Sequence, residues 1–271
     1  AVLGEYTNSR EDTEIASRLQ LNWFPTENIL TYFSWNRGVK GGGYNAPIFP
    51  LSPPNDYDDA TLSYDPEQLD AYEIGIKNEL GEYGRVNLAA YYYDYNNYQI
   101  FNIIGLDTFT VNSPSASSQG IEVEYQASLG DSWDVLFGVA YNDAEATLLD
   151  GSKQTPVQSP KWNVNGLLRY TLPLASGSLS LQGDFVFRDD VKFALIDAET
   201  VMQEAYTLYN ASVTYTSSDD KWQLKAFVDN LTDEEYMVQA FDLSSTDVFG
   251  ITEQYYGKPR WWGVSVKYSW L

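Results

Sequence analysis

The chain has 271 residues, a formal net charge of −22, and neither cysteine nor histidine. Without cysteine it has no disulfide and no thiolate metal site, and without histidine it has no Ser/His/Asp or Cys/His catalysis and no histidine-ligated zinc or haem. The negative charge argues against a nucleic-acid partner, whose phosphates require a basic surface. Hydrophobic residues make up 44% of the chain, which indicates a folded protein.

No run of apolar residues is long enough for a membrane helix, and residues 1–5 lack the features of a signal peptide. The mean hydropathy of −0.36 is ordinarily that of a soluble protein. A transmembrane barrel can have the same value, because each strand averages an apolar face with a polar one.

Eleven segments alternate apolar with polar or small residues, which is the pattern of a β-strand whose two faces meet different surroundings. In chain order they are residues 15–24, 29–36, 67–80, 85–96, 120–129, 133–141, 161–172, 179–187, 206–215, 222–230 and 258–271. The last is the clearest, since Trp262, Val264, Val266, Tyr268 and Trp270 alternate with Gly263, Ser265, Lys267 and Ser269.

The connections between these segments alternate strictly between five short turns and five long loops. Residues 81–84 and 130–131 are short turns, whereas residues 37–66 and 231–257 are long loops. A soluble sandwich mixes connection lengths, but an outer-membrane barrel has short periplasmic turns and long extracellular loops. The sequence therefore predicts an all-β fold, an antiparallel transmembrane β-barrel with about 11 strands in this chain.

Proline and tryptophan support this prediction. All eleven prolines fall in predicted turns or loops or at the first residues of a strand, as an unbroken hydrogen-bond ladder requires. The eight tryptophans lie at strand ends, which predicts aromatic belts at both membrane interfaces, and the run 91–93 of three tyrosines is assigned to the outer belt. The alternative is that aromatic residues merely favour strands.

Several motifs resemble those of TonB-dependent outer-membrane receptors, and together they span nearly the whole chain. Residues 230–236, Asn-Leu-Thr-Asp-Glu-Glu-Tyr, are similar to a signature near the end of that family. Residues 34–45 resemble its Ser-x-x-Arg-Gly-x-Lys-x-Gly-Gly-x-Asn segment. Residues 66–77, residues 120–122 and Pro160 follow in the family's order.

This resemblance implies a barrel of about 22 strands with a plug, energised through TonB. Residues 1–271 would then be the C-terminal half of the barrel, and the N-terminal strands, the plug and the TonB-contacting segment would lie outside this sequence. The implied partners are outer-membrane lipid, those missing parts, TonB and the barrel-assembly machinery. The family commonly ends on phenylalanine, whereas Trp270 and Leu271 end this chain.

The predicted loops suggest candidate binding residues. Basic and aromatic side chains in or beside the loops could contact a ligand; those chosen are Arg37, Lys40, Tyr44, Tyr57, Phe109, Phe241 and Tyr255. The carboxylates of Asp56, Asp58 and Asp59 could bind calcium, but an ordinary solvated acidic loop is the favoured interpretation, because no fixed ligand spacing is present. Apart from that calcium no cofactor is expected, and a transported ligand could carry iron.

The resemblance implies active transport of a scarce large solute across the outer membrane of a Gram-negative bacterium, with a ferric siderophore as the commonest substrate class. No catalytic constellation is visible, so we expect no enzyme. The alternatives are uptake of an oligosaccharide or cobalamin by the same fold, a passive substrate-specific porin, and a soluble all-β binding protein or carbohydrase.

Overall fold

The computed structural model describes residues 7–47, 58–104, 107–195, 198–242 and 250–270. Its main feature is one antiparallel sheet in which eleven strands follow one another in chain order. These strands are β1 (Ser17–Thr26), β2 (Ile29–Lys40), β5 (Glu67–Glu79), β6 (Arg85–Ile104), β7 (Asp107–Leu129), β8 (Trp133–Thr147), β10 (Trp162–Leu174), β11 (Gly177–Arg188), β14 (Tyr206–Ser217), β15 (Trp222–Asp229) and β18 (Trp261–Tyr268). The eleven predicted strands are thereby confirmed.

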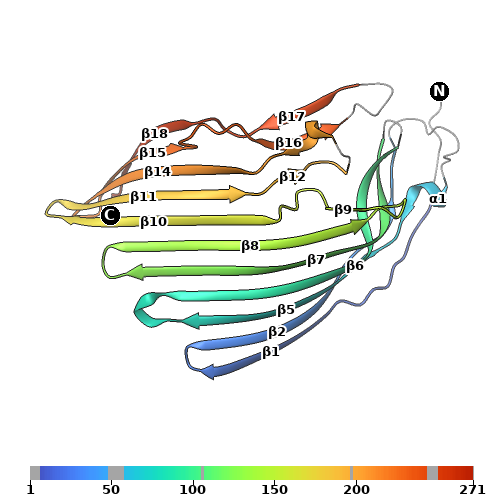
Figure 1. Cartoon of the computed structure of the whole chain (residues 1–271), viewed down its shortest axis with the longest axis horizontal. Helices are drawn as coiled ribbons and strands as arrows, with labels where there is room; N and C mark the ends of the chain where they lie inside the picture. Colours follow the sequence, from blue (N-terminus) through green and yellow to red (C-terminus); the bar gives the residue numbers. More distant parts are fainter. Residues whose placement is uncertain (1–6, 48–57, 105–106, 196–197, 243–249, 271) are drawn as a thin grey trace.

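The short turns lie together at one end of the sheet and the longer connections at the other (Figure 1). The longer connections hold small elements of their own: β3 (Gly43–Tyr44), α1 (Asp59–Leu62), β4 (Ser63–Tyr64), β9 (Lys153–Gln154), β12 (Val191–Lys192), the 3-10 helix η2 (Glu199–Val201), β13 (Met202–Gln203), β16 (Met237–Asp242) and β17 (Thr252–Tyr256). A further 3-10 helix, η1 (Gly81–Tyr83), forms one of the short turns. No helix in the described ranges is long and apolar enough to cross a membrane.

Strand pairing divides the side chains into two faces, because residues paired across antiparallel strands point to the same side. One row joins Val266, Leu224, Tyr215, Leu179 and Leu172. We call this side the apolar face. Many of its large hydrophobic side chains are exposed. In water this face would therefore be a large exposed apolar surface.

The opposite side, the polar face, carries the charged and amide residues of the same strands. One row joins Lys77, Asn87, Glu124, Gly138 and Asn165 across five strands. A second row nearer the loops joins Glu73, Tyr91, Gly120 and Asn142. The alternation predicted from the sequence therefore sorts the whole sheet into one apolar side and one polar side.

The prediction of a loop between residues 97 and 119 was wrong, because β6 and β7 extend into this region and pair with each other. We call this extension the arm. Their ladder runs from Arg85↔Gln126 to Ile104↔Asp107, and the arm curves away from the other strands beyond β8 (Figure 1). Serine, threonine and asparagine obscured the strand pattern here. Backbone pairing holds the arm together without a continuous apolar face, because only some of its side chains, such as Phe109, are buried.

The proline prediction was also wrong in part, because three prolines lie inside strands. Pro25 and Pro173 are next to the last residues of β1 and β10, and Pro114 is well inside β7. Pairing of β7 with β8 ends at Ser115↔Thr147, so β7 has no neighbour on that side at Pro114. Proline is tolerated where the ladder is open on one side.

The aromatic belts lie on the apolar face, but three residues predicted to belong to them do not. Tyr72 and Tyr92 stack at 6.5 Å between ring centroids on that face. Tyr91 and Tyr93 point to the polar side, because alternate residues of a strand face opposite ways. Trp261 does the same, pairing with Asp229 and touching Phe227.

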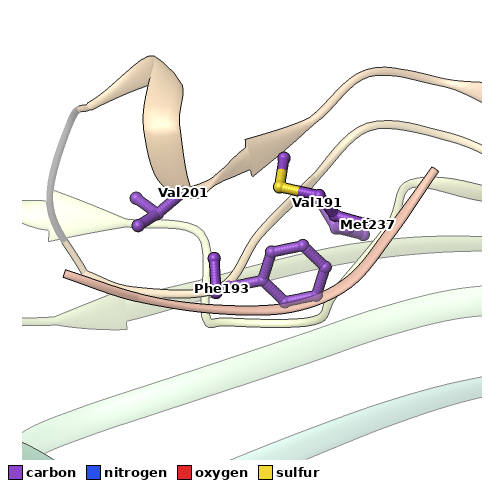
Figure 2. Close-up of a cluster of buried hydrophobic side chains, with 5 residues drawn as sticks. Val191, Phe193, Val201 and Met237 are labelled. Carbon is purple, nitrogen blue, oxygen red and sulfur yellow. The ribbon is translucent and has the colours of Figure 1, made fainter. Parts of the chain in front are cut away.

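Above the sheet, two of the longer connections share a small hydrophobic core. This loop core consists of Val191, Phe193, Val201, Met237 and Ala240. Four of these side chains converge from the β12–β13 and β16–β17 segments, as Figure 2 shows. Gln203 accepts a hydrogen bond from the Met237 backbone N–H at 2.6 Å, which joins the two segments directly. These connections are therefore a packed unit.

Loop length predicts which end of the sheet faces outward, and cysteine labelling checks it. The native chain has no thiol, so Ser152→Cys in the β8–β9 turn should react with an impermeant maleimide on intact cells. Gly130→Cys, in the short turn between β7 and β8, should react only after the outer membrane is opened. The reverse pattern would invert the topology. Asp56, Asp197 and Asp247, also expected outside, lie beyond the described residues.

Candidate functional site

A niche on the polar face lies at the loop end of β6, β7 and β8. Four tyrosines of β6 line it, Tyr91, Tyr93, Tyr95 and Tyr98, and we call it the tyrosine niche. Its volume is about 320 Å³, at the lower end of the range for small-molecule sites. Tyr91 lies beside Tyr92 of the belt, so the niche begins at the level of the belt and continues above it.

Small residues on the neighbouring strands let the tyrosine rings lie against the sheet. A Cβ at Gly120 would come within 2.5 Å of the Tyr91 hydroxyl oxygen, so glycine is required there. The Tyr91 hydroxyl donates to Asn142 Oδ1 at 2.9 Å, and the Ser118 hydroxyl donates to the same oxygen at 2.6 Å. The first tyrosine of the niche is therefore fixed by its surroundings.

The upper tyrosines owe their position to the twist of the arm. Asn97 has a φ of 53°, in the left-handed region that asparagine tolerates best among residues with a side chain. Beyond Asn97, Tyr98 meets Tyr95 edge to face at 5.4 Å, whereas strict alternation would place them on opposite sides. Burial, followed by the charge of Glu67, raises the pKa of both Tyr95 and Tyr98. Both phenols therefore remain protonated donors at neutral pH.

Arg37 forms an ion pair with Asp70 on the apolar face of the sheet. Its Nε donates to Asp70 Oδ1 at 2.9 Å, and Trp35 Nε1 donates to the same oxygen at 3.0 Å. The hydrogen bond from Arg37 lowers the pKa of the buried Asp70 carboxyl, and that from Trp35 adds to the effect. Arg37 thus anchors the loop end of β2 to β5.

This pair predicts a pH-dependent contribution to stability. A carboxyl whose folded pKa is lowered stabilises the fold above its unfolded pKa, and the contribution is lost as the pH falls through the folded value. Asp70→Asn should cost about 1 kcal/mol at neutral pH, since Arg37 is partly exposed. The difference in thermal unfolding midpoint between Asp70→Asn and the wild type should become smaller below about pH 4. A difference that does not change with pH would contradict this role of the ion pair.

Lys40, Tyr44 and Phe109 occupy three different surroundings. Lys40 ends β2 and pairs in register with Glu67. The Tyr44 hydroxyl donates to the backbone oxygen of Ser9 at 3.3 Å. Phe109 is fully buried in the arm, where Asn45 bonds both the N–H and the C=O of the next residue, Thr110. Phe109 therefore offers no surface to a ligand in this arrangement.

Phe241 and Tyr255 are brought together on the β16–β17 hairpin. Their rings meet edge to face at 6.3 Å, and each side chain is about half exposed. They lie on the side of the hairpin opposite Ala240 of the loop core. Phe241 and Tyr255 belong to the connection that follows β15, whereas Arg37, Lys40 and Tyr44 lie at the end of β2 and just beyond it, so the predicted ligand residues come from separate parts of the chain.

Two of the predicted calcium ligands, Asp58 and Asp59, lie at the start of α1. Asp58 caps that helix by accepting from the backbone N–H of Thr61 at 3.0 Å, and Asp59 Oδ1 accepts from Asn8 Nδ2 at 2.6 Å. Asp56 and Tyr57 lie outside the described residues. Within the described ranges, no group of three or more carboxylates is placed to hold a metal ion. Calcium binding here stays a prediction.

The tyrosine niche was missed from the sequence because the run of tyrosines was assigned as a whole to the belt. The alternation Tyr91, Tyr93, Tyr95 is itself a signal, since period two places these rings on the side opposite Tyr92. A larger, shallow hollow of about 670 Å³ lies mostly on the apolar face and is lined by Leu168, Leu181 and Val213. It has no cluster of polar side chains comparable to the niche.

Comparisons with known proteins agree with this architecture. The family model "TonB dependent receptor-like, beta-barrel" matches residues 2–231. The ferrichrome outer membrane transporter/phage receptor of Escherichia coli K12 is 24% identical over 250 residues, which cover 87% of this chain and 30% of that protein. The ferrioxamine receptor of Yersinia enterocolitica is 24% identical over 246 residues, which cover 88% and 32%. The chain thus spans about a third of these relatives.

Solved structures show the same fold. The ferric yersiniabactin uptake receptor FyuA of Yersinia pestis superposes with a TM-score of 0.77 at 18% identity, over 93% of this chain and 37% of that one. The ferric preacinetobactin receptor BauA of Acinetobacter baumannii gives 0.71 at 21% identity, over 93% and 36%. The chain belongs to the TonB-dependent receptor β-barrel family and lies in the outer membrane of a Gram-negative bacterium.

Proposed function

We propose that this chain is the C-terminal wall of a TonB-dependent transporter that imports a ferric siderophore. Two relatives at 24% identity are described as transporter or receptor for ferrichrome and for ferrioxamine, which favours this substrate class. Because the family consists of receptors and transporters, we propose transport without catalysis.

The observation that carries this proposal is the division of the sheet into two faces. In a barrel of this family the apolar face contacts lipid, and the polar face lines a lumen. The tyrosine niche lies on the lumen side at the loop end, where a ligand arriving from outside would first meet the wall. Glu124, Asn165 and their row lie deeper and can hold water or contact a plug.

The partners follow from the open edges of the sheet. The strands β1 and β18 are the first and last of eleven in an antiparallel path, so they run in the same direction. If two copies of this chain closed into one barrel with the same orientation in the membrane, β18 of each copy would therefore pair with β1 of the other in parallel. An all-antiparallel barrel needs an odd number of further strands, and we propose that these, together with the plug and the TonB-contacting segment, come from upstream of this sequence. We also propose the barrel-assembly machinery as a partner, because the family is assembled in the outer membrane.

Iron uptake tests the proposed function. The whole receptor would be expressed in a strain without its own siderophore receptors, and entry of radioactive iron would be measured with ferric ferrichrome and ferric desferrioxamine B. Uptake that stops when TonB is deleted is the expected result. Uptake that persists without TonB would indicate a passive porin.

The same cells separate the other candidate substrates. If no ferric chelate enters but labelled cobalamin or an oligosaccharide does, the siderophore proposal is overturned while the transport mechanism stands. An inactive plug variant of the same receptor, present at equal abundance in the membrane, serves as the control.

A further inference from the structure

We propose that the tyrosine niche is a subsite for an uncharged or cationic ferric chelate and disfavours an anionic one. This inference rests on the proposed function and adds to it a charge class and the residues that select it. A ferric tris-hydroxamate is neutral or carries a pendant ammonium, whereas a ferric tris-catecholate is trianionic.

The first observation is a set of hydrogen-bond donors without a protein acceptor. The hydroxyls of Tyr93, Tyr95 and Tyr98 have no hydrogen-bond partner among the described residues, although all three side chains line the niche. Phenols held in this way can donate to the outer oxygens of a chelate, and their rings can pack on its apolar parts.

The second observation is the charge of the lining. Glu122 is the only ionised side chain among the described residues that line the niche, and no lysine or arginine lines it. A carboxylate at the edge of an aromatic site attracts a cation and repels an anion. The net charge of −22 reinforces this preference over a longer range.

The third observation is that several segments of the chain enclose the niche and hold its lining residues in place. Gly120 and Asn142 fix Tyr91 from below. Pro156 and Ser159, from the connection between β9 and β10, line the niche together with the three sheet strands. Gln158, between them, is held by a hydrogen bond from its backbone N–H to the backbone oxygen of Lys192 at 2.9 Å. Rigid donors lose little entropy when a ligand binds.

The test varies charge on one scaffold. The purified whole receptor would be titrated with ferric desferrioxamine B, which is cationic, with its neutral N-acetyl form and with its anionic N-succinyl form. Affinity should fall from the cationic or neutral form to the anionic form by at least about fivefold. Ferric enterobactin, a tris-catecholate, should bind more weakly than all three.

Two variants assign the effect to the niche. Tyr93→Phe with Tyr95→Phe keeps the rings and removes two donors, so it should weaken the neutral form by about 3- to 30-fold. Glu122→Gln should reduce the difference between the cationic and anionic forms. Tyr92→Phe is the matched control, because it changes the same run of residues on the lipid side and should leave binding unchanged.

The outcomes separate this inference from the proposed function. If ferric enterobactin binds best, or if the Tyr93/Tyr95 double variant binds like the Tyr92 control, the niche does not select the ligand, and siderophore transport still stands. If no ferric chelate binds to the whole receptor while another solute does, the proposed function fails first and this inference fails with it.

Discussion

Replacing Val266 by arginine in the whole receptor should destabilise the folded barrel by about 2 to 4 kcal/mol. Val266 lies on the apolar face, 62% exposed, between Tyr268 at the belt and Val264 further along β18. In the membrane this exposed surface contacts hydrocarbon. A guanidinium there loses its hydration without gaining a partner, and the cost is largest near the middle of the bilayer.

The neighbouring residue supplies the control. Lys267 pairs with Gln223 on the polar face, so Lys267→Glu keeps a charge in a wet lumen and should cost much less. Both variants would be folded into lipid vesicles, and unfolding would be followed in denaturant by tryptophan fluorescence. If Lys267→Glu proves the more damaging change, the two faces of the sheet have been assigned the wrong way round.

Strand positions within the membrane could be predicted from the sequence because a bilayer and a lumen impose opposite demands on alternate residues. Val264 is apolar and faces lipid, whereas Ser265 is polar and faces the lumen, as this rule requires. The predicted ends of their strand lie within a few residues of the observed ends. The rule fails above the membrane. There both faces of the β6–β7 arm meet water or other loops, so the arm carries no regular alternation although its strands pair up to Ile104↔Asp107.

The site was harder to predict because it depends on contacts between distant segments and on local backbone geometry. Nothing in the sequence shows that Asn97 would place Tyr98 beside Tyr95. Phe109 was chosen as an exposed ligand residue, yet it is fully buried where the arm meets the first long connection. Arg37 was chosen for its charge, but it forms an ion pair with Asp70. Asp70 lies two residues before the belt residue Tyr72 on β5.

The loop core links the outer connections to the niche. Gln158 donates from its side chain to Gln239 Oε1 of β16 at 3.1 Å, in addition to its backbone bond to Lys192 of β12. Its neighbours Pro156 and Ser159 line the tyrosine niche. The packing of β12 and β16 around Phe193 therefore determines where this part of the niche wall lies.

Phe193→Ala should loosen the loop core while the sheet remains folded. Removing a buried phenylalanine costs about 3 kcal/mol, which raises the population of locally opened loops about a hundredfold. Protease added to intact cells should then cut residues 188–205 and 230–260 faster, and the anionic and cationic chelates should be distinguished less well. The heat-modifiable gel mobility of the barrel should not change, because Phe193 lies outside the ladder of β11 and β14.

Phe241→Ala is the matched control for this prediction. It removes the same side chain from the same pair of connections, but Phe241 is 49% exposed and lies on the side of β16 away from the loop core. A small effect on loop cleavage is expected, because an exposed ring leaves no cavity. Equal protease sensitivity in the two variants would show that burial of Phe193 is not what orders these loops. If Phe193→Ala also abolished the folded band, the loop core would be needed for assembly of the barrel itself.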